Sequence, residues 1–115
     1  MKIYAVKDGA QQNSGSTGFD RTQKSINPIG GGFRGYGLIK NKCLMLKGSV
    51  MGTKKRPILV KLPAGVPPKS MVNEKIDLKF IDTCSRTGHG RFQTSAEKRA
   101  SMGLLKKDVA AMSQK

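Results

Sequence analysis

Short apolar runs, separated by polar or glycine-rich stretches, dominate the chain and predict strands more than long helices. Residues 1–7 alternate weakly between apolar and polar side chains. Residues 42–47 and 57–62 are apolar runs of strand length. Residues 76–80 carry apolar side chains at every second position, which is typical of a half-buried strand. The pattern therefore predicts four short strands.

The stretches between these runs are rich in residues that favour turns. Residues 8–25 hold few apolar side chains and predict a mobile loop, and residues 26–37 are glycine-rich and predict a sharply bent segment. Prolines interrupt the chain after residue 62. We therefore expect a domain boundary there, with one unit over residues 1–62 and another over residues 63–115.

The C-terminal region carries a helix signal. Thr94 and Glu97 have capping-box spacing, in which each side chain can satisfy a backbone donor near the helix start. Gly103 interrupts the pattern, so we expect a short helix from about Ser95 and a break before Leu104. One apolar face continues through this region and consists of Met102, Leu105, Val109 and Met112.

Composition adds a strong electrostatic constraint. Twenty-two Lys and Arg face seven Asp and Glu, for a formal net charge of +15. Residues 1–57 carry a net +9 and residues 58–115 a net +6, so the charge is not confined to one tail. Only 37% of the 115 residues are hydrophobic, and 14 are glycine, which limits the core that the chain can build alone. These values favour a polyanion, above all a nucleic acid, as partner.

Other partners and chemistries find less support in the sequence. No apolar run approaches the ~18 residues of a membrane span, and the first residues are too polar for a signal peptide. Cys43, Cys84 and His89 are the only soft ligands besides methionine, and they lack paired metal-ligand spacing. We expect reduced thiols, no metal and no cofactor.

Two glycine motifs suggest a nucleotide-dependent enzyme as an alternative. Gly30, Gly32 and Gly35 match G-x-G-x-x-G, but the strand before the motif and the helix after it are missing from the pattern. The sequence "GSVMGTKK" resembles a phosphate loop, yet Gly48 and Gly52 are one position too close. The simpler interpretation is a glycine-shaped connection between strands.

Clusters of cations are the strongest candidates for a binding role. Lys54, Lys55 and Arg56 are adjacent within a strand connection, and in so basic a chain we favour phosphate contact over simple solvation. The sequence "SRTGHGRFQT" interleaves cations with glycines and Phe92, which suits a ribose-phosphate chain and a stacked base, although an exposed turn is the alternative. The predicted RNA-binding residues are Arg34, Lys54, Lys55, Arg56, Arg86, His89, Arg91, Lys106 and Lys107.

Several longer runs resemble a known family. "KSINPIGG", "YGLIKNKCLMLKGSVMGTKKR" and "EKIDLKFIDTCSRTGHGRFQTSAEKRASMGLLKKD" resemble the C-terminal part of the eukaryotic and archaeal-type protein three of the large ribosomal subunit, over roughly residues 22–110. The resemblance implies a mainly β fold: the C-terminal strands of an elongation-factor-like (SH3-like) β-barrel, followed by an irregular basic extension with a short helix. Residues 45–61 would be the last barrel hairpin.

The same resemblance implies a function. It points to a non-enzymatic structural constituent of the large ribosomal subunit, with ribosomal RNA and neighbouring ribosomal proteins as partners, cytoplasmic ribosomes as location and assembly in the nucleolus. A separate polypeptide, or a missing N-terminal part, would complete the barrel, since two orphan strands would leave unpaired edges. A free-standing regulatory RNA-binding protein is the remaining alternative.

Overall fold

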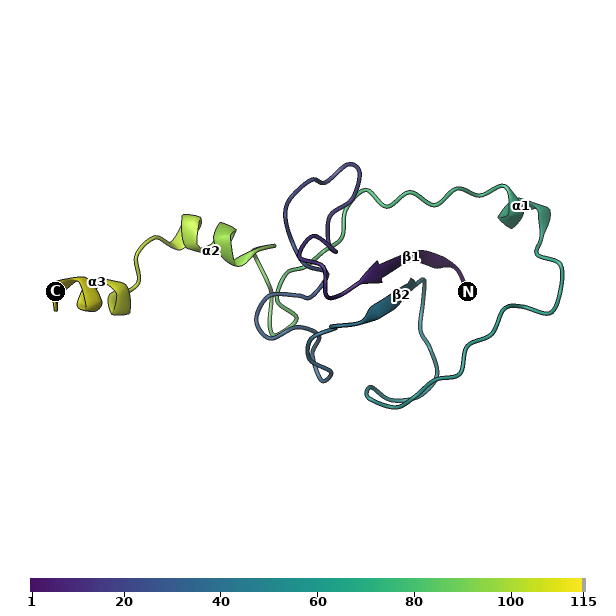
Figure 1. The fold of residues 1–115 in the computed structure, drawn as a ribbon, viewed down its shortest axis with the longest axis horizontal. Helices are drawn as coiled ribbons and strands as arrows, with labels where there is room; N and C mark the ends of the chain where they lie inside the picture. Colours follow the sequence, from purple (N-terminus) through teal and green to yellow (C-terminus); the bar gives the residue numbers. More distant parts are fainter. Residues whose placement is uncertain (115) are drawn as a thin grey trace.

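Two short strands form the only sheet within residues 1–114, which are the residues that the computed structural model describes. Lys115, the last residue of the predicted extension, lies outside this range. Three helices follow the strands in the chain (Figure 1). In order, the elements are β1 (Ile3–Asp8), β2 (Lys42–Leu46), α1 (Lys69–Val72), α2 (Ser95–Met102) and α3 (Lys106–Ser113).

Strands β1 and β2 pair in antiparallel fashion, which confirms strands in both predicted places. Val6 lies opposite Leu44, and a bulge lies between Ile3 and Ala5. Backbone hydrogen bonds extend the pairing beyond both ends, from Gly9 N to Asn41 O (3.0 Å) and from Lys47 N to Lys2 O (2.9 Å). The pair therefore joins the start of the chain to its middle across a long loop.

The other two predicted strands are wrong. Residues 57–62 were expected to pair with residues 42–47, but β2 pairs with β1 instead. Residues 57–62 and 76–80 contain no strand, although the chain is extended in much of both segments. An apolar run forms a ladder only where a neighbouring strand satisfies its backbone groups, and these runs have no such neighbour.

The expected barrel is likewise not present in the described part of the chain. Residues 1–114 hold one two-stranded sheet, and the three helices together contain more residues than the two strands. A two-stranded sheet is marginal without further packing. "Mainly β" is therefore only loosely correct, and the partial barrel of the prediction is reduced to this strand pair.

Hydrogen bonds tie the long loop after β1 to residues 79–85. Ser14 is buried, and its hydroxyl accepts a hydrogen bond from Ile26 N. The side-chain amide of Asn27 bonds both the N–H and the carbonyl of Ile39, at 2.7 and 3.0 Å, much as a strand neighbour would. Ile29 N donates to Thr83 O at 3.1 Å. In the loop that we predicted to be mobile, residues 8–25, the Thr17 hydroxyl donates to Lys79 O at 2.8 Å and the Lys24 ammonium to Ile81 O at 2.7 Å, so this loop is anchored.

Lys24 is a buried cation, with only 2% of its side chain exposed. Its ammonium donates to Ile81 O at 2.7 Å, lies 3.0 Å from Asp20 Oδ2 and sits 4.0 Å from the centre of the Phe80 ring. Hydrogen bonds, first from the Thr22 hydroxyl, lower the pKa of Asp20. A buried cation of this kind is tolerated only because each face of the ammonium has a partner.

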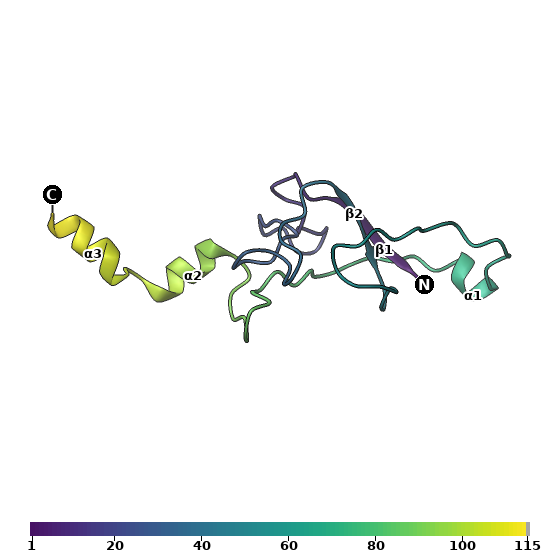
Figure 2. The same ribbon diagram turned by 90° about the horizontal axis from the view of Figure 1, so that it is seen from below.

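The hydrophobic core is small and the molecule is elongated. Within residues 1–114, the buried hydrophobic side chains are Ile26 and Ile81, together with the ring of Pro28. The Cα radius of gyration is 18.6 Å, compared with about 13 Å for a compact chain of this length. Figures 1 and 2 both show α2 and α3 extending away from the rest of the chain, so we call residues 95–114 the arm.

Helix α2 begins where the capping signal placed it. Thr94 Oγ1 accepts a hydrogen bond from Glu97 N at 3.1 Å. The Glu97 carboxylate accepts from Gln93 N at 2.8 Å, one residue earlier than a capping box requires. Gly103 ends the helix with a positive φ of 68°, and this confirms the predicted break. Helix α3 then starts after Leu105, whose N–H donates to Asp108 Oδ2.

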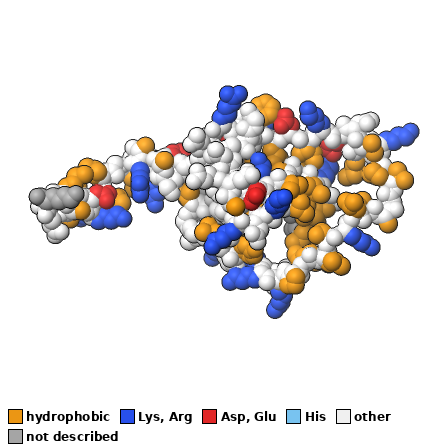
Figure 3. All heavy atoms as spheres, viewed as in Figure 1, with side chains coloured by type: hydrophobic (Ala, Val, Ile, Leu, Met, Phe, Trp, Pro, Cys, Tyr) orange, Lys and Arg blue, Asp and Glu red, His pale blue; other side chains and the backbone are white. Residues whose placement is uncertain are grey.

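Large apolar side chains are strongly exposed along the segment between β2 and α1. Leu59 is 97% exposed and Val66 is 95% exposed, and both belong to the extended segment that leads from β2 to α1. In the space-filling view, hydrophobic atoms gather around the strand pair and along this segment (Figure 3). We call residues 57–72 the apolar loop.

Candidate nucleic-acid interface

Three of the predicted RNA-binding residues meet at one open hollow of about 500 Å³. Arg34 comes from the glycine-rich segment, Lys54 from the connection after β2 and Arg86 from the turn after residue 83. These segments lie far apart in the sequence. The remaining lining residues are Phe33, Tyr36 and Ile39.

A tight turn presents Arg34 and Tyr36 to solvent. Phe33 and Gly37 exchange two backbone hydrogen bonds, at 2.9 and 2.8 Å, and the chain reverses between them. Gly35 lies at the turn with a φ of 76°, a value that side-chain-bearing residues rarely adopt. Arg34 is exposed, and Tyr36 is 55% exposed. The glycines that resembled a dinucleotide fingerprint therefore shape a turn, and the next regular element is strand β2.

Lys54 reaches the hollow by lying against this turn. A Cβ atom at Gly35 would come within 3.2 Å of Lys54 Cδ and 3.6 Å of Lys54 Nζ, so a larger residue here would push the Lys54 side chain slightly aside. The connection itself bends at Gly48 and Gly52, both with positive φ, as predicted. Lys55 also has a positive φ, of 69°. Lys55 and Arg56 are exposed but do not line the hollow.

Residues 84–92 form a turn closed by Thr83 and Gln93. Thr83 is 1% exposed, and its hydroxyl donates to Gln93 O at 2.7 Å while its N–H donates to Gln93 Oε1 at 2.8 Å. Gln93 Nε2 donates to Asp82 Oδ1 at 2.8 Å and, together with the Cys84 N–H, lowers the pKa of Asp82 to about 2. Arg86 lies 3.4 Å from Asp82 Oδ2. Asp82 therefore remains ionised and orients this cation.

The other two candidates on this turn do not enter the hollow. His89 and Arg91 are exposed, and Arg91 lies 5.2 Å from the centre of the Phe92 ring. The Cys84 thiol donates to Asp82 Oδ2 at 3.4 Å, which raises the pKa of Cys84. Cys43 and Cys84 are both free thiols. The turn thus places Arg86 at the hollow and leaves His89 and Arg91 exposed outside it.

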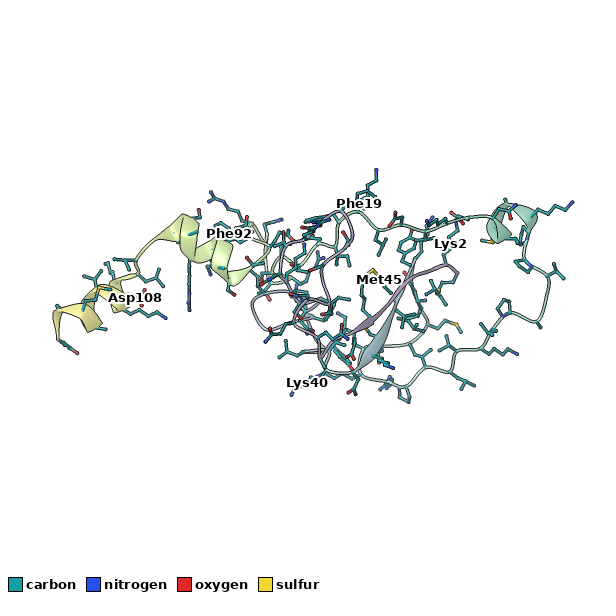
Figure 4. All side chains as sticks on the ribbon, turned by 45° about the horizontal axis from the view of Figure 1, so that its top comes forward. Lys2, Phe19, Lys40, Met45, Phe92 and Asp108 are labelled. Carbon is teal, nitrogen blue, oxygen red and sulfur yellow. The ribbon has the colours of Figure 1, made fainter. Side chains whose placement is uncertain are left out.

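The last two candidates lie on the arm. Lys106 and Lys107 belong to the first turn of α3. Figure 4 shows Phe92 at the base of the arm and Asp108 far along it, well away from the strand pair. Lys107 lines a second groove at the bend between the helices, whose other cations are Lys98 and Arg99. The arm is therefore a separate cationic surface.

Sequence reasoning missed several residues that shape these surfaces. Phe33, Tyr36 and Ile39 were not assigned to a site, although aromatic residues next to Arg34 in a glycine-rich run were a usable signal. Lys98 and Arg99 were also missed. Arg99 follows Glu97 by only two positions, whereas helical ion pairs join residues three or four positions apart, so an ion pair with Glu97 does not account for this cation. Nothing in the local sequence distinguishes the buried Lys24 from an exposed lysine.

No group of three or more His, Cys, Asp or Glu side chains within residues 1–114 is placed to hold a metal ion. None of the helices described in this range is long and apolar enough to cross a membrane.

The fold and the hollow define a strongly cationic chain, with three cations from separate segments lining one hollow. Comparison with known proteins names its family. The family model for ribosomal protein L3 matches residues 1–88. Large ribosomal subunit protein uL3 of Caenorhabditis briggsae is 52% identical over 114 residues, and that of Caenorhabditis elegans 51% over 114 residues; each match covers 96% of this chain and 28% of the relative. The Candida albicans protein of the same name is 50% identical over 108 residues, which are 94% of this chain and 28% of the relative.

The chain belongs to the ribosomal protein L3 family, as the resemblance indicated. It spans about 28% of the length of the curated relatives that it matches. Their name places those relatives in the large ribosomal subunit.

Proposed function

We propose that this chain is a structural, non-enzymatic constituent of the large ribosomal subunit that binds and stabilises ribosomal RNA. One observation carries the proposal beyond family membership: Arg34, Lys54 and Arg86 converge on one hollow from three separate segments. In a chain of net charge +15, such convergence suits a polyanion better than an acidic protein side chain.

The proposed mechanism is neutralisation of phosphates, with shape as the selective element. Lys and Arg side chains release counterions from the RNA, so affinity falls steeply as salt rises. Glycine-shaped bends allow the backbone to lie close to the RNA. The nine predicted RNA-binding residues would act in three groups: the hollow, the outer cations of the two exposed turns, and the arm.

We further propose how the partners divide between two surfaces of the chain, the hollow and the apolar loop. The predicted boundary between residues 62 and 63 stays a proposal, as do nucleolar assembly and residence on cytoplasmic ribosomes. Ribosomal RNA would contact the hollow, while neighbouring protein, either a separate polypeptide or the remainder of the L3-family protein, would cover the apolar loop and complete the sheet. Exposed side chains such as Leu59 support the need for such a cover.

Sedimentation of the tagged chain from cells tests the function. The chain is expected to travel with large ribosomal subunits and to remain there through a moderate salt wash, whereas a free-standing regulatory protein would be released. The triple variant Arg34→Gln, Lys54→Gln, Arg86→Gln should be lost at lower salt. A matched control carries Lys40→Gln, Lys61→Gln and Lys69→Gln, which remove the same charge outside the hollow. Equal loss from both variants, or no association with subunits, would contradict the proposal.

A further inference from the structure

The lining of the hollow contains aromatic and apolar side chains in addition to the cations that phosphate binding requires. Half of its lining residues are cations, Arg34, Lys54 and Arg86, and the others are Phe33, Tyr36 and Ile39. Phosphates need only the cations. An aromatic surface beside them suits a second kind of group, namely the flat face of a nucleobase.

The occupant must therefore offer a base face and phosphates together. Bases inside a duplex are stacked on their neighbours and cannot present a face, whereas a bulged or looped-out nucleotide can. A hollow of about 500 Å³ lies within the usual range of sites for small-molecule-sized groups. Its size thus suits one nucleotide.

The cations are available for such a group. Within residues 1–114, neither Arg34 nor Lys54 makes an ion pair, and no acidic side chain lines the hollow. Arg86 pairs with Asp82 at 3.4 Å, but both side chains are nearly half exposed, so the pair is readily exchanged. The aromatic wall is equally available, because Tyr36 is more than half exposed.

The site is also held in shape before anything binds. Two backbone hydrogen bonds between Phe33 and Gly37 fix the turn that carries Tyr36. Lys54 rests against Gly35, and the Thr83–Gln93 hydrogen bonds close the turn that carries Arg86. A preformed site loses less entropy on binding than one that has to be assembled.

We propose that this hollow holds a single unpaired nucleotide of a ribosomal RNA, with the base stacked on Tyr36 and its phosphates bound by Arg34, Lys54 and Arg86. This inference rests on the proposed function, since it names the part of the RNA that the site recognises. The remaining cations bind backbone phosphates without regard to pairing.

Two short RNA hairpins that differ only by one bulged adenosine test the proposal. Binding of the 115-residue chain to each is measured by fluorescence anisotropy over a range of salt. The bulged hairpin is expected to bind roughly tenfold more tightly, the order of effect of one base stacked on an aromatic ring. Tyr36→Ala should remove this preference, while Tyr36→Phe should keep it. Leu38→Ala, at 54% exposure and outside the lining, is the matched control.

A second variant tests the cationic wall. Gly35→Ala places a methyl group against Lys54, whereas Gly37→Ala, also at positive φ, meets nothing within 4 Å. We expect the first to weaken binding of the bulged hairpin several-fold more than the second. Equal, salt-dependent binding of both hairpins would overturn the inference and leave the proposed function standing. Salt-independent or absent binding of both would overturn both proposals. A bulge preference that survives Tyr36→Ala would place the base elsewhere and would also overturn the inference.

Discussion

The body of the molecule and the apolar loop differ in the kind of side chain that is buried and the kind that is exposed. In the body, which comprises residues 9–41 and 79–93, polar side chains such as Ser14, Lys24 and Thr83 are buried and hydrogen-bonded. In the apolar loop, side chains such as Leu59 lie in solvent. The usual distribution of polar and apolar groups is thus partly inverted.

This difference separates what the chain determines from what a partner determines. Buried polar groups have directional hydrogen bonds, so the body has one well-defined arrangement of its segments. In the apolar loop, Leu59, Leu62 and Val66 are 84% exposed or more within the described residues, and contiguous apolar surface normally marks an interaction site. The body is therefore expected to keep its shape alone, and the loop to take its final shape on assembly.

The largest expected effect comes from removing the buried ammonium. Lys24→Met keeps most of the side-chain volume but leaves Ile81 O without its 2.7 Å donor. We expect the body to lose about 2 kcal/mol or more of stability, since an unsatisfied buried acceptor costs ~1–3 kcal/mol. Urea unfolding followed by amide hydrogen exchange at residues 14–29 measures the loss.

Lys2→Met is the matched control for this change. Lys2 pairs with Glu74 at 2.8 Å, with side chains 29% and 38% exposed, and ion pairs at the surface contribute roughly 0–1 kcal/mol. If the two variants destabilise the chain equally, the contrast between a polar body and a loosely attached periphery is wrong.

A somewhat smaller loss is expected from Thr83→Val, which preserves shape and removes one hydroxyl. Gln93 O loses its 2.7 Å hydrogen bond, at a cost of ~1–2 kcal/mol. Because this bond closes the turn that carries Arg86, trypsin should cleave after Arg86 and Arg91 faster than in the unchanged chain. Thr87→Val, at an exposed position of the same turn, should leave the cleavage rate as it was.

Features with a local cause could be predicted from the sequence. The start of α2 at Thr94, the break at Gly103 and both paired strands follow from side chains within a few positions of each other. The partner of β2 could not be predicted, because pairing depends on which strand is available and not on the run itself. The buried Lys24 was equally hidden, since Ile81, its acceptor, lies 57 positions away.

The candidate site shows the same limit. Charge alone selected Arg34, Lys54 and Arg86, but only the fold brings them to one hollow and leaves Lys106 and Lys107 on the arm. Tyr36 has its proposed role because of its position in a turn. The glycines around it indicated a bend but not which side chain the bend would present. Contact with RNA stays a prediction both for the residues that line the hollow and for Lys106 and Lys107 on the arm.

A substitution that destabilises helix α2 in the arm is expected to leave the stability of the body unchanged. Thr94→Ala removes the acceptor of Glu97 N, and loss of an N-cap costs ~1 kcal/mol of helix stability. Amide exchange in α2 should accelerate while exchange at residues 14–29 stays constant. Ser95→Ala, one position later, keeps the cap and is expected to leave α2 unchanged. Loss of protection in the body on Thr94→Ala would show that arm and body fold as one unit.

The smallest effect should come from titrating Asp82, which lies where body and arm meet. Hydrogen bonds from Gln93 and Cys84 hold its pKa at about 2, below the ordinary value of 3.8. The ionised carboxylate therefore stabilises the turn above about pH 4, and this stabilisation is lost as the pH falls from there through about 2. Because the side chain is 44% exposed, solvent screening keeps the loss small. The Gln93 side-chain amide resonance should shift over this range, and Asp82→Asn should abolish the shift. A midpoint near 4 would show that Asp82 lacks these hydrogen bonds in solution, and that the turn presenting Arg86 is less firmly attached to the body than the 2.8 Å contact indicates.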